Sequence, residues 1–222
     1  MFSVITLEDT VRVLPTDQRK GLPTAVTDEL NKKYSNRIKP KVGLCIRVLD
    51  IIEIGDGIVH ACLDGSGMHR TKFRLIIFKP FVGEILTGKV VNQSPEGLRV
   101  SLEFFDDILI PEYMLKPNSN YNKTQGQWIW QYQDDESGDI QNMEIERDEM
   151  IRFRVEAQHF NDVRPPIPNA NSVDPKRAAS ANLSPVLAPI GAGGAGKELR
   201  ASAFWLECSI TDDGLGLLSW WS

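Results

Sequence analysis

The sequence predicts an α+β domain at the N-terminal end, followed by an all-β barrel. One amphipathic helical pattern lies before residue 40, among segments that have the composition of strands. From residue 81 onward the patterning consists of short apolar segments typical of β-strands. Lys79-Pro80 separates the two regions, and proline cannot donate a hydrogen bond to a central ladder. The predicted domains are therefore residues 1–80 and 81–222.

The composition is that of a soluble globular protein able to bury a core. Of 222 residues, 41% are apolar, and no apolar run approaches the roughly 18 residues that a membrane span needs. The first residues lack the basic start and apolar block of a secretory signal. Cys45, Cys62 and Cys208 lie far apart with no CxxC pair, which indicates reduced thiols in an intracellular protein rather than disulfides or a zinc site.

Charge is distributed unevenly between the two predicted domains. The net charge is −5. Residues 1–80 carry 13 Lys+Arg against 9 Asp+Glu, a difference of +4, and residues 81–222 carry 12 against 21, a difference of −9. This balance argues against a protein that binds polyanions over its whole surface. Either the two halves meet different electrostatic partners, or the charges simply cover solvated faces unevenly.

The first domain is predicted to start with a strand and a helix. Residues 2–14 alternate well enough for a strand, which Pro15 closes. A helical pattern follows over residues 22–37, and we expect Pro40 to end it. One apolar stripe recurs every four residues in this pattern: Leu22, Val26, Leu30 and Tyr34.

Residues 42–80 are predicted to form three antiparallel strands. Gly55-Asp56-Gly57 is one hairpin signal, and the run from Asp64 to Gly67 is a second. Strand, helix and meander together make a compact α+β unit of about 80 residues.

The second domain is predicted to be a small Greek-key barrel of the OB-fold class. Its hairpin turn at residues 92–97 contains Pro95, which presets one dihedral angle, and Gly97, which tolerates the left-handed region. Short strands at this spacing suit such a barrel. The expected strands cover residues 83–93, 98–102, 106–111, 126–132, 149–160, 202–210 and 214–221.

Two insertions interrupt the barrel. Residues 134–149 are acidic and polar and are predicted to form a solvated loop. Residues 165–197 are rich in Pro, Ala, Ser, Asn and Gly and contain no aromatic residue. Such a segment cannot bury enough surface to offset its ordering entropy, so disorder or an extended loop is predicted.

No catalytic, cofactor or metal site is predicted. The run GAGGAGK at residues 191–197 lacks the hydroxyl residue and the preceding strand of a phosphate-binding loop. His60 and His69 flank the second hairpin, where a two-ligand metal site is conceivable, but ordinary strand histidines are favoured. The pairs Asp106-Asp107 and Asp212-Asp213 are adjacent in sequence, so their side chains diverge, and Asp212-Asp213-Gly214 has the composition of a turn.

A nucleic-acid interface is the binding hypothesis that the barrel supports. OB-folds bind single strands with aromatic rings that stack on bases and with cations that follow phosphates. Lys89 and Arg99 lie on the strands either side of the 92–97 turn and are predicted to share a face. Phe104 and Phe105 follow, and alternation predicts one ring in the core and the other exposed. The alternative is a barrel surface used for nothing, or for protein.

The tryptophans are numerous for this length. Trp128 and Trp130 are two apart on a predicted strand and therefore face the same side. Core or interface burial is the favoured interpretation for them, with a stacking platform as the alternative. The others are Trp205, Trp220 and Trp221.

Several motifs together resemble a known family. They are FKPFVGEILTGKVV, EGLRVSLEFFDDILIPEYML, WIWQY, EMIRFRVEAQHFNDVRP and the closing GLGLLSWW. They look like the stalk subunits of nuclear DNA-directed RNA polymerases and their archaeal counterpart, and the polymerase III member is the most similar. The resemblance covers the chain except residues 165–197.

The resemblance implies an N-terminal tip domain, built like a truncated RNA-recognition fold, that docks on the polymerase core. A C-terminal OB barrel projects outward beside the RNA exit path. Such a subunit forms a heterodimer with a smaller helical partner, works in the nucleus, needs no cofactor and has no catalytic residues. Initiation factors and nascent RNA are its further expected partners.

The barrel motif departs from the family pattern. A Gly-small-Phe-Val run, whose aromatic ring stacks on RNA, corresponds here to Gly97-Leu98-Arg99-Val100, so Arg99 stands at the aromatic position. A His-Ile-Ser run corresponds to Leu109-Ile110-Pro111. Weak, salt-sensitive RNA contact is therefore expected.

Three functions remain open from the sequence. The first is a non-catalytic stalk subunit of RNA polymerase III that supports transcription of tRNA and other small RNA genes. The second is a free-standing OB-fold module that binds single-stranded RNA. The third is an enzyme whose site the sequence does not reveal.

Overall fold

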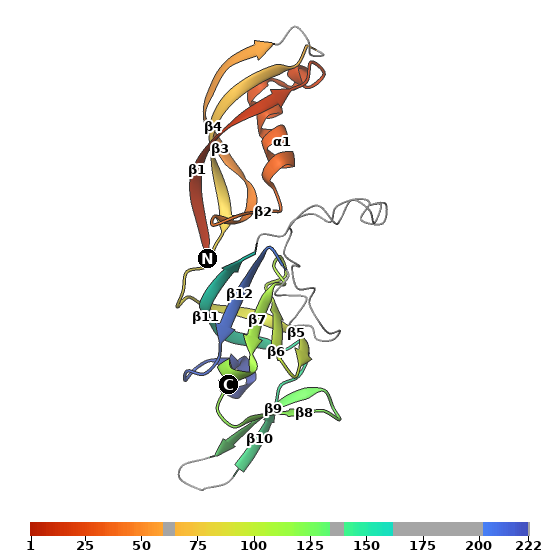
Figure 1. The fold of residues 1–222 in the computed structure, drawn as a ribbon, viewed down its shortest axis with the longest axis vertical. Coiled ribbons are helices and arrows are strands. Elements are labelled where there is room, and N and C mark those ends of the chain that lie inside the picture. Colours follow the sequence, from red (N-terminus) through yellow and green to blue (C-terminus); the bar gives the residue numbers. More distant parts are fainter. Residues whose placement is uncertain (60–64, 134–139, 162–201, 222) are drawn as a thin grey trace, which may run out of the picture.

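The chain folds into two stacked parts with a small sheet at the far end. The computed structural model describes residues 1–59, 65–133, 140–161 and 202–221. Figure 1 shows the N-terminal sheet at the top, the barrel below it and strands β8–β10 at the bottom. The predicted insertion at residues 165–197 and the GAGGAGK run lie outside the described residues. No helix in the described part is both long enough and apolar enough to span a bilayer.

The N-terminal part is a four-stranded antiparallel sheet with one helix against it (Figure 1). Its strands, in spatial order, are β1 (Phe2–Val13), β4 (Gly67–Phe78), β3 (Gly43–Val59) and β2 (Arg37–Lys39). A short 3-10 turn, η1 (Asp17–Lys20), precedes helix α1 (Leu22–Tyr34). The predicted stripe is confirmed for Val26 and Leu30, which are buried against Phe73 and Leu75, and for Tyr34, which is partly buried there, but Leu22 is exposed.

Helix α1 ends earlier than Pro40. It stops at Tyr34, where Ser35 is extended and caps the helix through its N–H, which donates to the Asn31 carbonyl at 2.9 Å. Pro40 lies instead in the connection between β2 and β3. The prediction missed β2, because three residues are too few to show a period.

Strand β3 replaces two of the three strands expected in residues 42–80. The Gly55-Asp56-Gly57 signal is not a hairpin, since β3 continues to Val59. Its register with β4 shifts four times, and each of the first three shifts leaves one extra apolar residue: Ile46, Leu49 and Ile52. Repeated bulges of this kind coil a strand without ending it. The last shift spans Gly55 and Asp56, and the next paired residue, Gly57, lies under the His69 ring, where an added Cβ would approach Cε1 to 2.5 Å.

The second hairpin signal is confirmed by the antiparallel pairing of β3 with β4. Asp64 and His60 lie outside the described residues, so the connection itself is not described. Cys45 and Cys208 are buried and free, and Cys62 is among the residues not described.

A closed five-stranded barrel of OB-like type forms the second part, as predicted. Its strands are β5 (Ile85–Ser94), β6 (Gly97–Ser101), β7 (Ile108–Pro111), β11 (Met150–Phe160) and β12 (Phe204–Ser209). They run in the order β12-β7-β6-β5-β11, and β12 also pairs with β11, which closes the ring. The segment 214–221, expected as a strand, holds only β13 (Gly216–Leu217) before the 3-10 helix η4 (Leu218–Trp221).

The turn from β5 to β6 forms as predicted. Ser94 pairs with Gly97, with Pro95 and Glu96 between them. Gly97 has φ 142°. A Cβ added there would lie 2.1 Å from the Ile110 carbonyl oxygen on β7. Only glycine allows this close approach of β6 to β7.

A second, three-stranded sheet lies outside the barrel. It contains β8 (Ser119–Asn122), β9 (Gln127–Gln133) and β10 (Ile140–Glu144), in the order β10-β9-β8. The short helix η2 (Glu112–Met114) links β7 to it. The segment 126–132 is therefore not a barrel strand, and part of the expected loop at 134–149 is the strand β10. Residues 134–139 lie outside the description.

The two parts pack against each other at the end of β4. Phe78 is fully buried and belongs to the barrel's apolar cluster rather than to the one under α1. The Phe104 ring meets the Phe78 ring edge-on at 5.0 Å and lies 5.6 Å from the Phe2 ring. The N-terminal ammonium of Met1 pairs with Glu84. The junction is therefore a packed interface rather than a free hinge.

Candidate nucleic-acid interface

Lys89 and Arg99 share the outer face of the barrel, as predicted. Lys89 pairs with Ser101, and Arg99 lies two residues before Ser101 on β6, so both side chains point away from the core. The flanking residues Val90 and Val100 are fully buried, which confirms the alternation. The register shift between Val90 and Asn92 therefore brings the two cations to one face.

Both cations already have carboxylate partners. The Lys89 ammonium lies 3.0 Å from Asp148, and the Arg99 guanidinium lies 3.7 Å from Asp107. Asp107 also accepts a hydrogen bond from the Ser202 hydroxyl at 2.7 Å. An RNA phosphate has to compete with these acids, so the face suits weak and salt-dependent binding.

The two phenylalanines lie away from this cationic face. Phe105 is 5% exposed, and its ring packs on Phe78 and Phe204 in the core, so it is not available to a base. Phe104 is 44% exposed but contacts Phe2 and Phe78 at the junction. The expected split between a core ring and an exposed ring is correct, but the exposed ring serves the junction instead of extending the Lys89 and Arg99 face.

Sequence analysis missed one basic residue near Arg99. Val91, Asn92, Arg99, Asp106 and Arg147 line one open depression. A bulge in β5 between Val90 and Asn92 leaves Val91 exposed, so one apolar side chain and two guanidinium groups line the same depression. Arg147 follows β10 and lies 48 positions beyond Arg99, so no local pattern could have linked the two.

The described residues contain no group of three His, Cys, Asp or Glu side chains that could hold a metal ion. His69 is buried, and its Nδ1 lies 3.1 Å from the Gly55 carbonyl, which matches the strand histidine that the sequence favoured. Asp212 and Asp213 lie in a turn closed by the Leu215 N–H, which donates to the Asp212 carbonyl at 3.3 Å. They serve as ion-pair partners of Arg154 and Lys116.

Comparison with known proteins decides the family. Residues 84–221 match the family model described as RNA polymerase III subunit Rpc25. The chain belongs to the Rpc25 family. Residues 8–67 match a second model, the SHS2 domain found in the N terminus of Rpb7p and Rpc25p. These matches confirm the resemblance drawn from the motifs and the prediction of a polymerase III stalk subunit.

Whole-chain relatives of this Rpc25-family chain carry the same description. DNA-directed RNA polymerase III subunit RPC8 of Bos taurus is 36% identical over 222 residues, which cover 100% of this chain and 99% of the relative. The Saccharomyces cerevisiae subunit of the same name is 34% identical and is covered in full. Rpo7, an RNA polymerase subunit of Saccharolobus solfataricus, is 25% identical over 57% of this chain and 69% of its own length.

Proposed function

We propose that the chain works in the nucleus as a non-catalytic stalk subunit that holds a smaller helical partner as a heterodimer and supports initiation at tRNA and other small RNA genes. One observation carries this proposal. Relatives named as polymerase III subunits align over 100% of this chain, tip and barrel alike. Both parts of the chain are therefore available for docking on the polymerase and for holding the partner.

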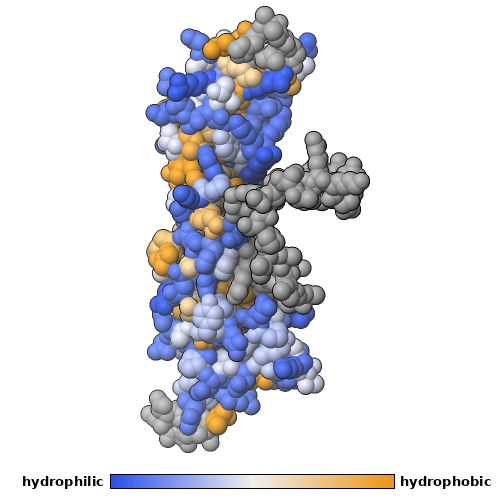
Figure 2. Space-filling model, in the orientation of Figure 1, coloured by the Kyte–Doolittle hydropathy of each residue, from blue (hydrophilic) through white to orange (hydrophobic). Residues whose placement is uncertain are grey.

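A surface for the helical partner surrounds the junction of the two parts. Figure 2 shows apolar patches along one side of the molecule, over β1 and the link between β4 and β5. We call this region the junction surface; it consists of Phe2, Val4, Phe81, Val82, Ile85 and Phe104, all exposed. An exposed apolar group of this size beside an interdomain contact is typical of a protein interface.

Nascent RNA is a secondary ligand in this proposal. The cations Lys89, Arg99 and Arg147 face solvent near each other, yet carboxylates already pair with the first two. None of the five residues that line the depression at Arg99 is aromatic, so we expect the binding energy from stacking there to be small. These features favour a polymerase subunit with modest RNA contact over a free-standing RNA-binding module.

Affinity purification of the tagged full chain from nuclear extract tests the proposal. We expect the polymerase III subunits and one smaller helical protein in constant proportion to the tagged chain. A chain that is recovered as a monomer and binds single-stranded RNA with about nanomolar Kd would instead establish the free-standing module.

A further inference from the structure

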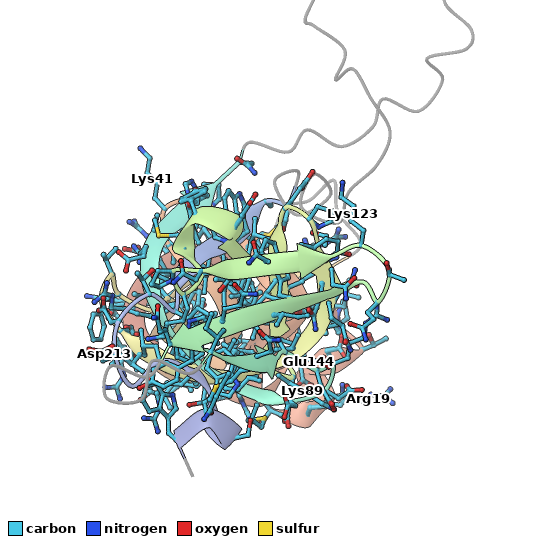
Figure 3. The ribbon with its side chains drawn as sticks, turned by 90° about the horizontal axis from the view of Figure 1, so that it is seen from below. Arg19, Lys41, Lys89, Lys123, Glu144 and Asp213 are labelled. Atoms are coloured by element: carbon cyan, nitrogen blue, oxygen red, sulfur yellow. The ribbon has the colours of Figure 1, made fainter. Side chains whose placement is uncertain are left out.

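Strand β10 is an open edge in the described part of the chain. It pairs antiparallel with β9 and lies at the end of the sheet order β10-β9-β8. Figure 3 views this end of the molecule, with the small sheet in front of the barrel, Lys123 on one side of it and Glu144 on the other. An edge of this kind presents backbone donors and acceptors to which an extended segment can pair.

The register shows which backbone groups of β10 point outward. The Gln131 N–H donates to the Asn118 carbonyl beyond β9, so the backbone of Gln131 points away from β10. Asn142 is paired with Gln131, so its own N–H and C=O point away from β9. The same alternation applies to Ile140 and Glu144, and these three residues present free edge groups.

No device that usually protects an edge is found on β10. The strand has no bulge, proline or lysine, and Ile140 at its start is 65% exposed. The other described edges differ. Beyond Cys45, where its pairing with β2 ends, β3 is bulged at every third residue. Strands β2, β8 and β13 are only 3, 4 and 2 residues long, and the first residues of β1 belong to the junction surface.

The sheet is mounted rigidly on the barrel. The buried Gln93 side chain accepts a hydrogen bond from the Trp128 N–H at 2.8 Å and donates to the Ile145 carbonyl at 2.6 Å. The Trp128 indole donates to the Ser94 carbonyl at 2.9 Å. Trp128 and Ile145, the two residues that Gln93 holds, lie close to β10. An added strand would therefore pair with a fixed template, and little entropy would be lost in ordering the sheet.

The C-terminal helix η4 adds a second anchor. The Trp220 ring lies 4.8 Å from the Trp130 ring. The Lys116 ammonium lies 5.6 Å from the ring centres of both Trp130 and Trp221 and donates to the Asp212 carbonyl at 2.7 Å. Burial lowers the pKa of Lys116, although the nearby Asp213 carboxylate opposes the shift.

Charge next to the edge selects the kind of segment that can bind. Glu144 and Glu146 are exposed on and after β10, and Arg147 is the one base within residues 140–150. Asp148 is also exposed but already pairs with Lys89. Repulsion from these acids disfavours a nucleic acid. We propose that β10 pairs with an extended, basic segment of another protein of the polymerase assembly, which adds a strand to the sheet. The inference rests on the proposed function for the source of that segment.

Site-specific photocrosslinking tests the pairing. A benzophenone amino acid replaces Ile140 in the tagged full chain, which is purified with the polymerase and irradiated. We expect a crosslink to a polypeptide stretch that is rich in Lys and Arg. Asn142→Pro should lower its yield by roughly five-fold or more, because proline removes the outward N–H and leaves the bonds to β9 intact.

Asn142→Ala is the matched control, because it removes the amide side chain but keeps the backbone N–H; its crosslink should stay within about two-fold of the unmodified strand. Crosslinks to RNA alone, to an acidic or helical stretch, or to nothing would overturn the inference, as would equal yields from the Pro and Ala variants. Recovery of polymerase subunits in the same preparation tests the proposed function separately.

Discussion

Arg99 shows how one side chain changes the chemistry of the barrel face. The resemblance to the family motif predicts an aromatic ring at this position. Arg99 shares the outer face with Lys89, and its guanidinium lies 3.7 Å from Asp107. A guanidinium can contact a phosphate or stack on a base, but an adjacent carboxylate lowers the gain from either contact. We therefore predict that RNA contact through this residue is electrostatic and depends on salt.

Arg99→Glu should weaken RNA contact by the assembled stalk. The reversed charge loses the phosphate contact and stands beside Asp107, so we expect photocrosslinking to a labelled single-stranded RNA to fall roughly five-fold, with a smaller difference at high salt. Arg19→Glu makes the same charge change on η1, far from the barrel face, and should leave the yield unchanged. An equal yield from both variants would exclude Arg99 from the interface.

Sequence reasoning predicted only some of the positions and contacts of these residues. It expected Lys89 and Arg99 to share a face, although strict alternation across a two-residue turn would place them on opposite faces. The bulge at Val91 shifts the register by one residue and turns Lys89 to the face of Arg99. It could not tell that Phe104 would be used by the junction, since its neighbours Phe2 and Phe78 are distant in sequence. Sequence reasoning could not identify the carboxylate partner of Lys89 either, because Asp148 is distant in sequence and comes next to β5 only in the folded chain.

Among the elements, the three-stranded sheet β8–β10 is held to the barrel by one buried amide, the side chain of Gln93. Gln93 belongs to the segment that the sequence assigned to a hairpin turn, and Trp128 belongs to a motif assigned to the barrel. The two residues meet because the Gln93 side chain lies between Trp128 on β9 and Ile145 after β10. There it takes the place of a backbone hydrogen bond between the two strands. Nothing in the local sequence signals this role, since a glutamine near a turn is ordinarily exposed.

Gln93→Leu should destabilise the fold markedly. The apolar isostere leaves the Trp128 N–H and the Ile145 carbonyl buried without partners, which costs about 2–4 kcal/mol. Urea unfolding of the full chain, followed by tryptophan fluorescence, measures the change. Gln131→Leu on the same sheet is exposed and should change stability by less than about 0.5 kcal/mol. Equal effects of the two substitutions would show that the amide bridge contributes nothing.

Elements whose apolar residues recur with a clear period were predicted well. Elements whose conformation depends on contacts between distant segments were not. Helix α1 and the strands β1, β5, β6 and β11 follow from patterning that local physics enforces. Strand β3 was divided in error because glycines at a bulge have the composition of a turn. The last residues form η4 rather than a strand because Trp220 packs on Trp130, a contact between distant segments.

At the scale of the whole molecule, the junction fixes how the two parts face a partner. Phe78 at the end of β4 is buried within the barrel cluster, and Gln158 on β11 donates to the Pro80 carbonyl. The sequence predicted a domain boundary at Lys79-Pro80, but nothing in it indicated that the two parts pack against each other. Because both sides are held together, the junction surface presents one continuous platform rather than two that move independently.

Phe81→Asp combined with Val82→Asp should therefore separate the helical partner from an intact chain. Both side chains are exposed, at 63% and 60%, so the charges cost the free chain little, but they would be buried in a heterodimer at a cost of several kcal/mol. We expect the co-expressed partner to be lost from the complex in size-exclusion chromatography, while circular dichroism and Tm of the chain stay near their original values. Ile140→Asp changes an equally exposed apolar residue at the far end and should retain the partner. If the double variant keeps the partner in equal proportion, the heterodimer forms elsewhere on the molecule.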